Sequence, residues 1–240
     1  MEQIETSANY QTRVGALRRE KTRMKLIENA LRVFAGKGAD APLIDDFIAA
    51  AGVARGTFYN YFRTTSELLA AVAGESSDEV LGVIDPLVRV VDDPAMRMAT
   101  GVRLYMHMAA LYPLWGAFIT RVGTERGSRG LLLDEYMTRD LQLGIDSGRF
   151  KVSEVTVARD ISLGTIRYGV ETLLSDQPPP CYAENMTYSL LLALGIEAGE
   201  ARNMAFSPLV ACPKPRGSIF KSIEGLPIMQ GLRPPIDNDK

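Results

Sequence analysis

Five side chains in the segment 54–61 have the chemistry needed to bind double-stranded DNA. Arg55 can fork onto guanine, Asn60 can form the equivalent pair of hydrogen bonds with adenine, and the Thr57 methyl group can pack on thymine. The phenols of Tyr59 and Tyr61 can donate to phosphate oxygens, which fixes register without carrying sequence information. The alternative for both tyrosines is that they are half-buried and pack against a neighbouring helix. Together the residue types favour a nucleic-acid recognition element.

The residues around this segment predict a helix-turn-helix. An apolar face at helical spacing indicates a helix over 45–51, and Gly52 can adopt the left-handed conformation that ends a helix. A further short helix over 54–61 follows, in which Gly56 allows close approach of the backbone to a ligand. Phe58 and Phe62 lie four residues apart and would anchor this helix to a core. In such a motif the second helix enters the major groove with its N-terminal part.

A basic amphipathic helix is expected before the motif. Ile27, Ala30, Leu31 and Phe34 form one apolar stripe of a helix over about 21–36. Between residues 10 and 37, eight lysines and arginines accompany only two glutamates. With the motif that follows, this surplus indicates contact with a polyanion; the alternative is a solvated helix face. Residues 1–20 show no sustained periodicity and are expected to form a flexible arm.

The rest of the chain is also helical in pattern, so the predicted fold class is all-α. Thr64 and Glu67 fit a capping box that begins a fourth helix. Further helices are expected at about 78–91, 94–111, 114–123, 128–147, 154–175 and 183–204. The expected organisation is an arm (1–20), a helix-turn-helix domain (21–73), a helical effector-binding and dimerisation domain (74–206) and a proline-containing tail (207–240). The six prolines of the tail rule out one continuous helix, so it is either disordered or draped over the body.

Two stretches, TRMKLIENALRVFAGKG at 22–38 and AAGVARGTFYNYF at 50–62, resemble the DNA-binding domain of the TetR (tetracycline-repressor) family. The resemblance covers about residues 18–72. It implies a dimeric transcription regulator, usually a repressor, that binds a palindromic double-stranded DNA operator and is released by an unidentified small-molecule effector. The chain departs from the family pattern at Pro42, Ala54 and Thr65, where a capping Thr, a Ser and a phosphate-binding Lys are common. The predicted DNA-binding residues are Arg55, Gly56, Thr57, Tyr59, Asn60, Tyr61 and Thr65.

The predicted helix over 154–175 has apolar residues on two faces. Val157, Ile161, Gly164 and Tyr168 lie roughly opposite the stripe that contains Leu163. A helix that is apolar on two faces must be covered on two sides. Either it lies at the centre of a monomeric bundle or it pairs with its copy in a homodimer, which the resemblance favours.

An effector cavity would be mostly apolar with a few polar groups. Aromatic residues, methionines and the single histidine of the chain provide such a set, although each could equally fill the core. The predicted ligand-binding residues are Tyr105, His107, Met108, Tyr112, Trp115, Phe118, Tyr136, Met137 and Tyr168.

Composition argues against several other classes of protein. The net charge of −2 is unlike that of a protein that coats nucleic acid indiscriminately, and the two cysteines lie far apart without metal-ligand spacing. The first thirty residues lack a signal-peptide core, and the longest apolar stretch is broken by Pro113 and Gly116, so a cytoplasmic protein without a membrane segment is expected. No catalytic constellation, metal site or cofactor motif is found, so no enzyme is expected. A helical interaction module would leave Arg55 and Asn60 unexplained; an activator, or a regulator that responds to a protein, remains the alternative function.

Overall fold

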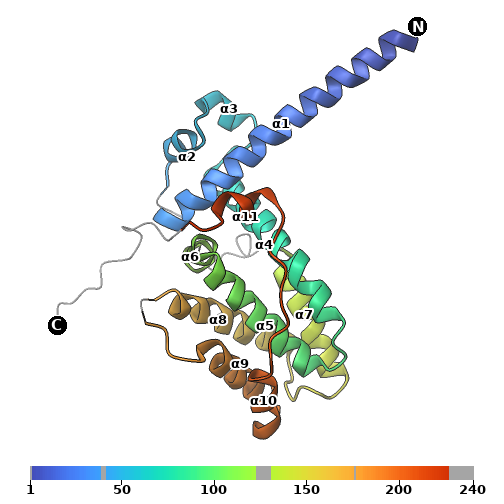
Figure 1. Ribbon diagram of the computed structural model, residues 1–240, viewed down its shortest axis with the longest axis vertical. Coiled ribbons are helices and arrows are strands. Elements are labelled where there is room, and N and C mark those ends of the chain that lie inside the picture. The colour runs from blue at the N-terminus through green and yellow to red at the C-terminus, as the bar shows by residue number, and fades with distance from the viewer. Residues whose placement is uncertain (1, 39–41, 123–130, 176, 227–240) are drawn as a thin grey trace, which may run out of the picture.

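The computed structural model describes residues 2–38, 42–122, 131–175 and 177–226. Over these residues the secondary structure is entirely helical, which confirms the predicted fold class. A small head carries the helix-turn-helix and a larger helical body lies below it (Figure 1). The elements are α1 (Glu2–Lys37), α2 (Ile44–Ala51), α3 (Arg55–Tyr59), α4 (Thr65–Arg89), α5 (Pro94–Leu111), α6 (Pro113–Arg121), α7 (Leu131–Asp146), α8 (Val155–Leu173), α9 (Tyr182–Ala193), α10 (Ala198–Ala205) and α11 (Ser218–Ile223).

The head is built around a cluster of phenylalanines. The rings of Phe34 and Phe47 lie 4.9 Å apart between centroids, and Phe47 stacks on Phe58 at 6.4 Å. Phe58 also contacts Phe62 at 6.2 Å, so both predicted anchors of the third helix are buried. Gly52 ends α2 with a φ of +59°, the left-handed conformation expected of it. This packing holds α3, which is too short to be stable in isolation.

The first helix is longer than its apolar pattern predicts. It begins at Glu2 rather than near residue 21, so the segment expected to be a flexible arm is helical. The segment contains no proline and only Gly15 among its glycines, so a helix nucleated by the buried turns around Phe34 can propagate through it. Figure 1 shows this part of α1 extending well past the rest of the head.

Two helix boundaries in the body also differ from the expected ones. Residues 65–89 form one continuous helix, α4, because nothing between Thr65 and Arg89 breaks it apart from the tolerated Pro86. Conversely, the expected helix over 183–204 is divided into α9 and α10 at Gly195, which has a φ of +87° that continues no right-handed helix. The expected break at 123–127 lies outside the described residues.

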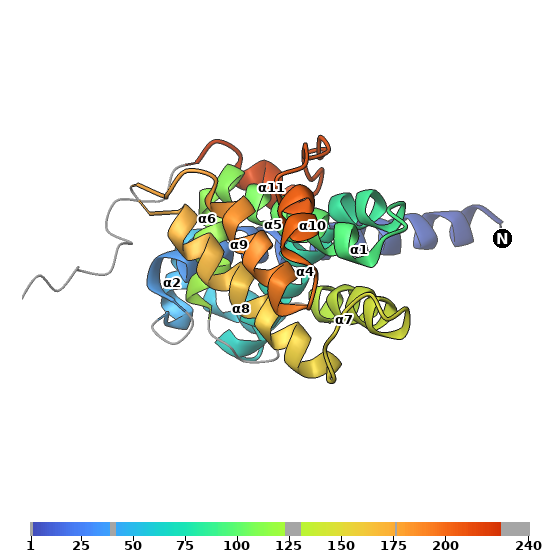
Figure 2. The same cartoon turned by 90° about the horizontal axis from the view of Figure 1, so that it is seen from below.

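Head and body share one hydrophobic core. The α1 ring of Phe34 contacts Phe118 of α6 at 6.3 Å, and Arg121 of α6 donates to the Gly36 carbonyl oxygen at 2.9 Å. Helix α5 runs through the body and contacts α4, α6, α7, α8, α9 and α10. Seen from below, α8 and α9 lie together along one side of the body and α7 lies next to α4 (Figure 2). The buried residues form a single continuous cluster from head to body.

The C-terminal segment returns from the far end of the body to the head. After α10 the chain runs without helix along the body and then forms α11, which lies against α1 and α4 (Figure 1). Of the two sequence expectations, the draped tail therefore describes residues 207–226; residues 227–240 lie outside the described chain. No helix among the described residues has both the length and the apolarity needed to cross a bilayer.

Candidate nucleic-acid interface and body cavity

Helix α3, the predicted recognition helix, exposes most of the side chains that are predicted to bind DNA. In α3 only Phe58 is buried, and Arg55, Gly56, Tyr59 and Asn60 are exposed. Tyr59 has 48% of its surface exposed, far more than a core aromatic would have. These side chains are therefore accessible to a binding partner.

The remaining predicted DNA-binding residues are partly covered. Thr57 and Thr65 are half-buried. Tyr61 is also half-buried and packs against the core of the head, which is the structural alternative that the sequence left open for it. A tyrosine held in this way can still present its hydroxyl group at the surface, but its ring contributes to stability first.

Arg55 already has an intramolecular partner. Its Nη2 lies 2.6 Å from Oδ1 of Asp45 on α2, with both side chains more than half exposed. The hydrogen bond and the charge of Asp45 raise the pKa of Arg55, which stays a cation. Asp45 therefore either orients the guanidinium for a base or competes with DNA for it.

The three helices of the motif begin with different kinds of cap. The N-cap of α2 is Leu43, and the Asp46 carboxylate accepts its N–H at 2.8 Å while pairing with Lys37 at 2.7 Å. Helix α3 has no side-chain cap, as its Ala54 implies. At the start of α4 the Thr64 hydroxyl accepts from the Glu67 N–H at 3.1 Å, as predicted.

Glu67 completes this cap one residue earlier than a standard capping box. Its Oε2 accepts from the N–H of Arg63 at 2.7 Å rather than from the N–H of Thr64. The turn that joins α3 to α4 is thus fixed from both sides. Because Thr65 is the first residue of α4, its backbone lies where helix N-termini bind phosphate.

Basic residues also line the exposed part of α1. Arg13, Arg18, Arg19 and Lys21 are all exposed. Arg23, one turn nearer to the head core, instead pairs with Glu75 of α4 at 2.5 Å. The positive surplus seen in the sequence is therefore available to solvent mainly on the N-terminal side of Arg23.

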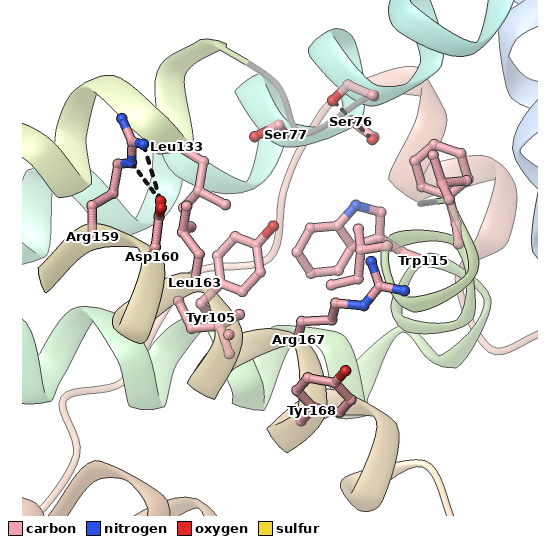
Figure 3. Close-up of a pocket in the computed structure, with 16 residues that line it drawn as sticks. Ser76, Ser77, Tyr105, Trp115, Leu133, Arg159, Asp160, Leu163, Arg167 and Tyr168 are labelled. Atoms are coloured by element: carbon pink, nitrogen blue, oxygen red, sulfur yellow. Dashed lines mark hydrogen bonds and ion pairs between the residues drawn. The ribbon is translucent and has the colours of Figure 1, made fainter. Parts of the chain in front are cut away.

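The body contains a cavity of about 410 Å³ between α4, α5, α6, α7 and α8. This volume lies within the range of small-molecule sites. Figure 3 shows Tyr105, Trp115 and Leu163 around it, with Arg159 and Asp160 on one side and Arg167 and Tyr168 on the other. Its wall consists of Ala73, Ser76, Ser77, Tyr105, Trp115, Phe118, Ile119, Val122, Leu133, Arg159, Asp160, Leu163, Gly164, Ile166, Arg167 and Tyr168.

Buried polar groups without partners lie in the cavity wall. Neither the Trp115 Nε1–H nor the Ser77 hydroxyl group has a hydrogen-bond partner within the described part of the chain, although both residues are buried. Burial also raises the pKa of the Tyr105 hydroxyl, which stays a neutral donor. Unpaired buried polar groups cost free energy, so they are usually satisfied by a bound molecule or water. An indole N–H can only donate, so it requires an acceptor such as a hydroxyl or carbonyl oxygen.

The walls of the cavity differ in part from the predicted set. Tyr105, Trp115, Phe118 and Tyr168 lie in them as expected. His107 is exposed, because two residues along α5 rotate a side chain by about 200° away from Tyr105. Met108 and Tyr112 are buried elsewhere in the core.

Tyr136 and Met137 also belong elsewhere. They border a separate cavity of about 50 Å³ that shares Tyr105 with the larger one. The residues predicted for one ligand site therefore lie around more than one cavity. Both residues lie on α7, which contacts α4, α5 and α8.

Five polar residues of the larger cavity were missed by the sequence. Arg159, Asp160 and Arg167 are absent from the predicted ligand-binding residues; Arg159 and Asp160 pair at 3.0 Å beside the cavity. Ser76 and Ser77 interrupt the otherwise apolar inner face of α4, which is the signal that could have located them. Across the described ranges no group of three metal-binding side chains occurs.

Two family models match the chain in the order of its two structural parts. Residues 26–72 match the model described as bacterial regulatory proteins of the tetR family. Residues 93–206 match the model described as the tetracyclin repressor-like C-terminal domain. This protein belongs to the TetR family. It is therefore a helix-turn-helix transcription regulator, and the resemblance noted in the sequence is confirmed.

Solved structures of similar proteins cover most of this TetR-family chain. RolR in complex with resorcinol is 29% identical, with a TM-score of 0.68, over 82% of this chain and all of that one. FadR from Bacillus subtilis in complex with stearoyl-CoA is 21% identical, with a TM-score of 0.52, over 77% of this chain and 97% of that one, which shows the shared fold alone.

A curated relative matches a short part of the chain. The uncharacterized HTH-type transcriptional regulator YvdT of Bacillus subtilis (strain 168) is 41% identical over 49 residues. The match spans 20% of this chain and a quarter of that protein.

Proposed function

We propose that this TetR-family regulator is a repressor that binds a palindromic operator as a homodimer and releases it when a small aromatic effector enters the body cavity. The observation that carries the proposal is the recognition helix: one buried anchor, Phe58, fixes a helix whose Arg55, Tyr59 and Asn60 are all exposed. Arg55 lies at the N-terminal end of α3 and Asn60 is its C-cap, and exposed Arg and Asn side chains suit contacts with base edges in the major groove. Membership of the family supports the assignment.

Dimerisation is supported by an uncovered apolar face on α8 and α9. Val157 and Ile161 of α8 are 56% and 41% exposed, and Leu192 of the adjacent α9 is 40% exposed. These are the residues of the second apolar stripe predicted for this helix, together with a neighbour. Large exposed apolar patches mark interaction surfaces, and a two-fold copy of the same face is the simplest cover. Such a dimer also supplies the two heads that a palindromic operator requires.

The effector class follows from the cavity. Its volume of about 410 Å³ and the tilted pair formed by Tyr105 and Trp115, 5.0 Å apart between ring centroids, suit a small flat molecule. The unpaired Trp115 N–H and Ser77 hydroxyl suit oxygen substituents on that molecule. RolR, a relative at 29% identity, was solved with resorcinol, a small aromatic diol. A hydroxylated aromatic compound is therefore the proposed effector.

Helix α4 is the element that can transmit binding to the head. It carries Ser76 and Ser77 in the cavity wall and begins at Thr65, next to the recognition helix. The 12 residues between Thr65 and Ser77 span about 18 Å of continuous helix. A ligand that binds one position of α4 better than another shifts the orientation of both recognition helices.

The proposal is tested in two steps. Selection from a random double-stranded DNA library should return a palindrome, to which the purified protein binds with an affinity that falls as salt rises. Because Trp115 is the only tryptophan of the chain and lines the cavity, titration with resorcinol should change its fluorescence. The same resorcinol concentration should lower operator affinity. Recovery of no specific DNA would refute the DNA-binding proposal, and unaltered affinity in saturating resorcinol would refute the effector class.

A further inference from the structure

The segment 207–226 lies beyond the matched C-terminal family domain, which ends at residue 206, yet its helix α11 buries apolar side chains in the core. Ile219, Phe220 and Ile223 of α11 are each 1% exposed or less. All three belong to the continuous hydrophobic cluster of the molecule. The segment is therefore an integral part of the fold, and its contacts show which parts it connects.

On one side α11 supports the cavity wall. The Phe220 ring meets the Trp115 indole edge-on, with 5.5 Å between ring centroids, and meets Tyr112 at 4.8 Å. The indole of Trp115 contacts Tyr105 and lines the cavity. A molecule that presses on Trp115 from within the cavity therefore presses on Phe220 as the next layer.

On the other side α11 is bonded to the head through α1. Arg32 of α1 donates from Nη2 to the Ser222 carbonyl oxygen at 2.5 Å, near the C-terminal end of α11. Arg32 lies in the same buried stretch of α1 as Phe34, whose ring contacts Phe47 of α2. A shift of α11 along this bond would therefore move the helix on which the helix-turn-helix is packed.

The N-terminal end of α11 is fixed to α4. Both carboxylate oxygens of Glu79 accept backbone N–H groups, from Ile219 and Phe220, each at 3.2 Å. Gly217 permits this approach, because a Cβ there would clash with the Glu79 carboxylate. With its N-terminus held on α4 and its C-terminus on α1, α11 spans the two helices that enter the head.

We infer that the segment 207–226 is a strap that couples the cavity to the DNA-binding head, with Phe220 contacting the cavity wall through Trp115 and Ser222 holding α1 through Arg32. The inference rests on the proposed function, because it assigns a route by which cavity occupancy alters DNA affinity. It differs from the route through α4 in using contacts that only the C-terminal segment makes. Its coupling depends on the Arg32 bond, whereas a merely stabilising lid would need only the buried apolar residues.

The test is a double-mutant cycle between the two ends of this route. Trp115→Phe replaces the indole in the cavity wall by a smaller aromatic ring. Arg32→Met removes the hydrogen bond to Ser222 of α11 and keeps an unbranched aliphatic side chain. Lys221→Met is the matched control, since it removes one positive charge from an exposed position on α11 itself. The primary measurement is hydrogen exchange of the α1 amides over residues 26–37, which requires neither an operator nor an effector.

If the segment is a strap, Trp115→Phe should change the hydrogen-exchange rates of the α1 amides in the wild-type and K221M backgrounds. In the R32M background the change should be at least about twofold smaller, because about twofold is the smallest coupling typical of residues in contact. Equal effects in all three backgrounds, or no effect on α1 in any, would overturn the inference. Operator affinity with and without resorcinol is measured on the same variants. If the wild type binds no specific DNA, the proposed function fails, whereas the exchange result still decides whether α11 couples wall and head.

Discussion

We expect the ion pair between Arg55 and Asp45 to make DNA affinity depend on Asp45, a residue that need not touch DNA. Arg55→Ala should weaken binding to the selected operator by about 1–3 kcal/mol, roughly 5- to 150-fold, the value of a forked contact with guanine. The pair itself is exposed, with 55% and 65% of the two side chains accessible, so it contributes little to the stability of the fold. If DNA must displace Asp45, Asp45→Asn should tighten binding by about 1.4- to 5-fold.

Fluorescence anisotropy with a labelled operator fragment checks this expectation in the single variants and in the R55A/D45N double variant. The gain from D45N should be larger in the wild-type background than in R55A, because only the former has a guanidinium to release. Thermal unfolding serves as the control for folding, and the small stability of the pair predicts a Tm shift of only a few degrees. Weaker binding by D45N with Arg55 present would refute competition, since it would show that Asp45 orients the guanidinium for its base.

Three further expectations follow from the body. Ile161→Glu should place a charge in the proposed α8 interface, giving a monomer in analytical ultracentrifugation and at least about tenfold weaker operator binding. Gly116→Ala should lower the free energy of unfolding in urea by about 1–3 kcal/mol, because its Cβ would lie 2.8 Å from a backbone carbonyl of α5; Gly74→Ala, with open space around it, is the control. Asp93→Asn keeps the cap of α5 but loses the charge pair with Arg149, which lowers the pKa of Asp93. Because the pKa of Asp93 is lower in the folded state, its charge stabilises the fold at pH values above its ordinary pKa near 3.8. The substitution should therefore lower the free energy of unfolding at pH 7 by about 1 kcal/mol, a value discounted for partial exposure. This difference should disappear as the pH falls below 3.8 and through the lowered pKa of the folded state.

The head could be predicted in detail because its signals are local. Phe58 and Phe62 are four residues apart, Gly52 ends α2 in the left-handed conformation, and Thr64 caps α4. Each of these features depends only on residues that are close in the sequence. The start of α1 was missed for the same reason. Its first turns carry no apolar face, so their helicity depends on propagation from the buried part of the helix.

The cavity and α11 depend on contacts between distant parts of the chain. Helical periodicity places Tyr105 on a buried face but cannot decide whether that face meets a wall of side chains or a space, which depends on how α4, α6 and α8 pack around it. Helix α11 has six residues and follows a proline-rich stretch, so local propensity gives little reason to expect it. Its start is stabilised by Glu79, 140 residues earlier in the chain.

The shared core between head and body limits how freely this regulator can be recombined with others. Phe34 of α1 packs on Phe118 of α6, and Arg121 of α6 donates to the Gly36 carbonyl oxygen, so part of the surface that stabilises the head belongs to the body. A chimaera that joins a foreign DNA-binding head to this body should therefore keep head and α6 residues that fit each other, because mismatched side chains would leave a cavity at the junction and lower stability. The segment to transfer when a chimaeric regulator is built from this chain is thus the head together with the face of α6 that packs against it.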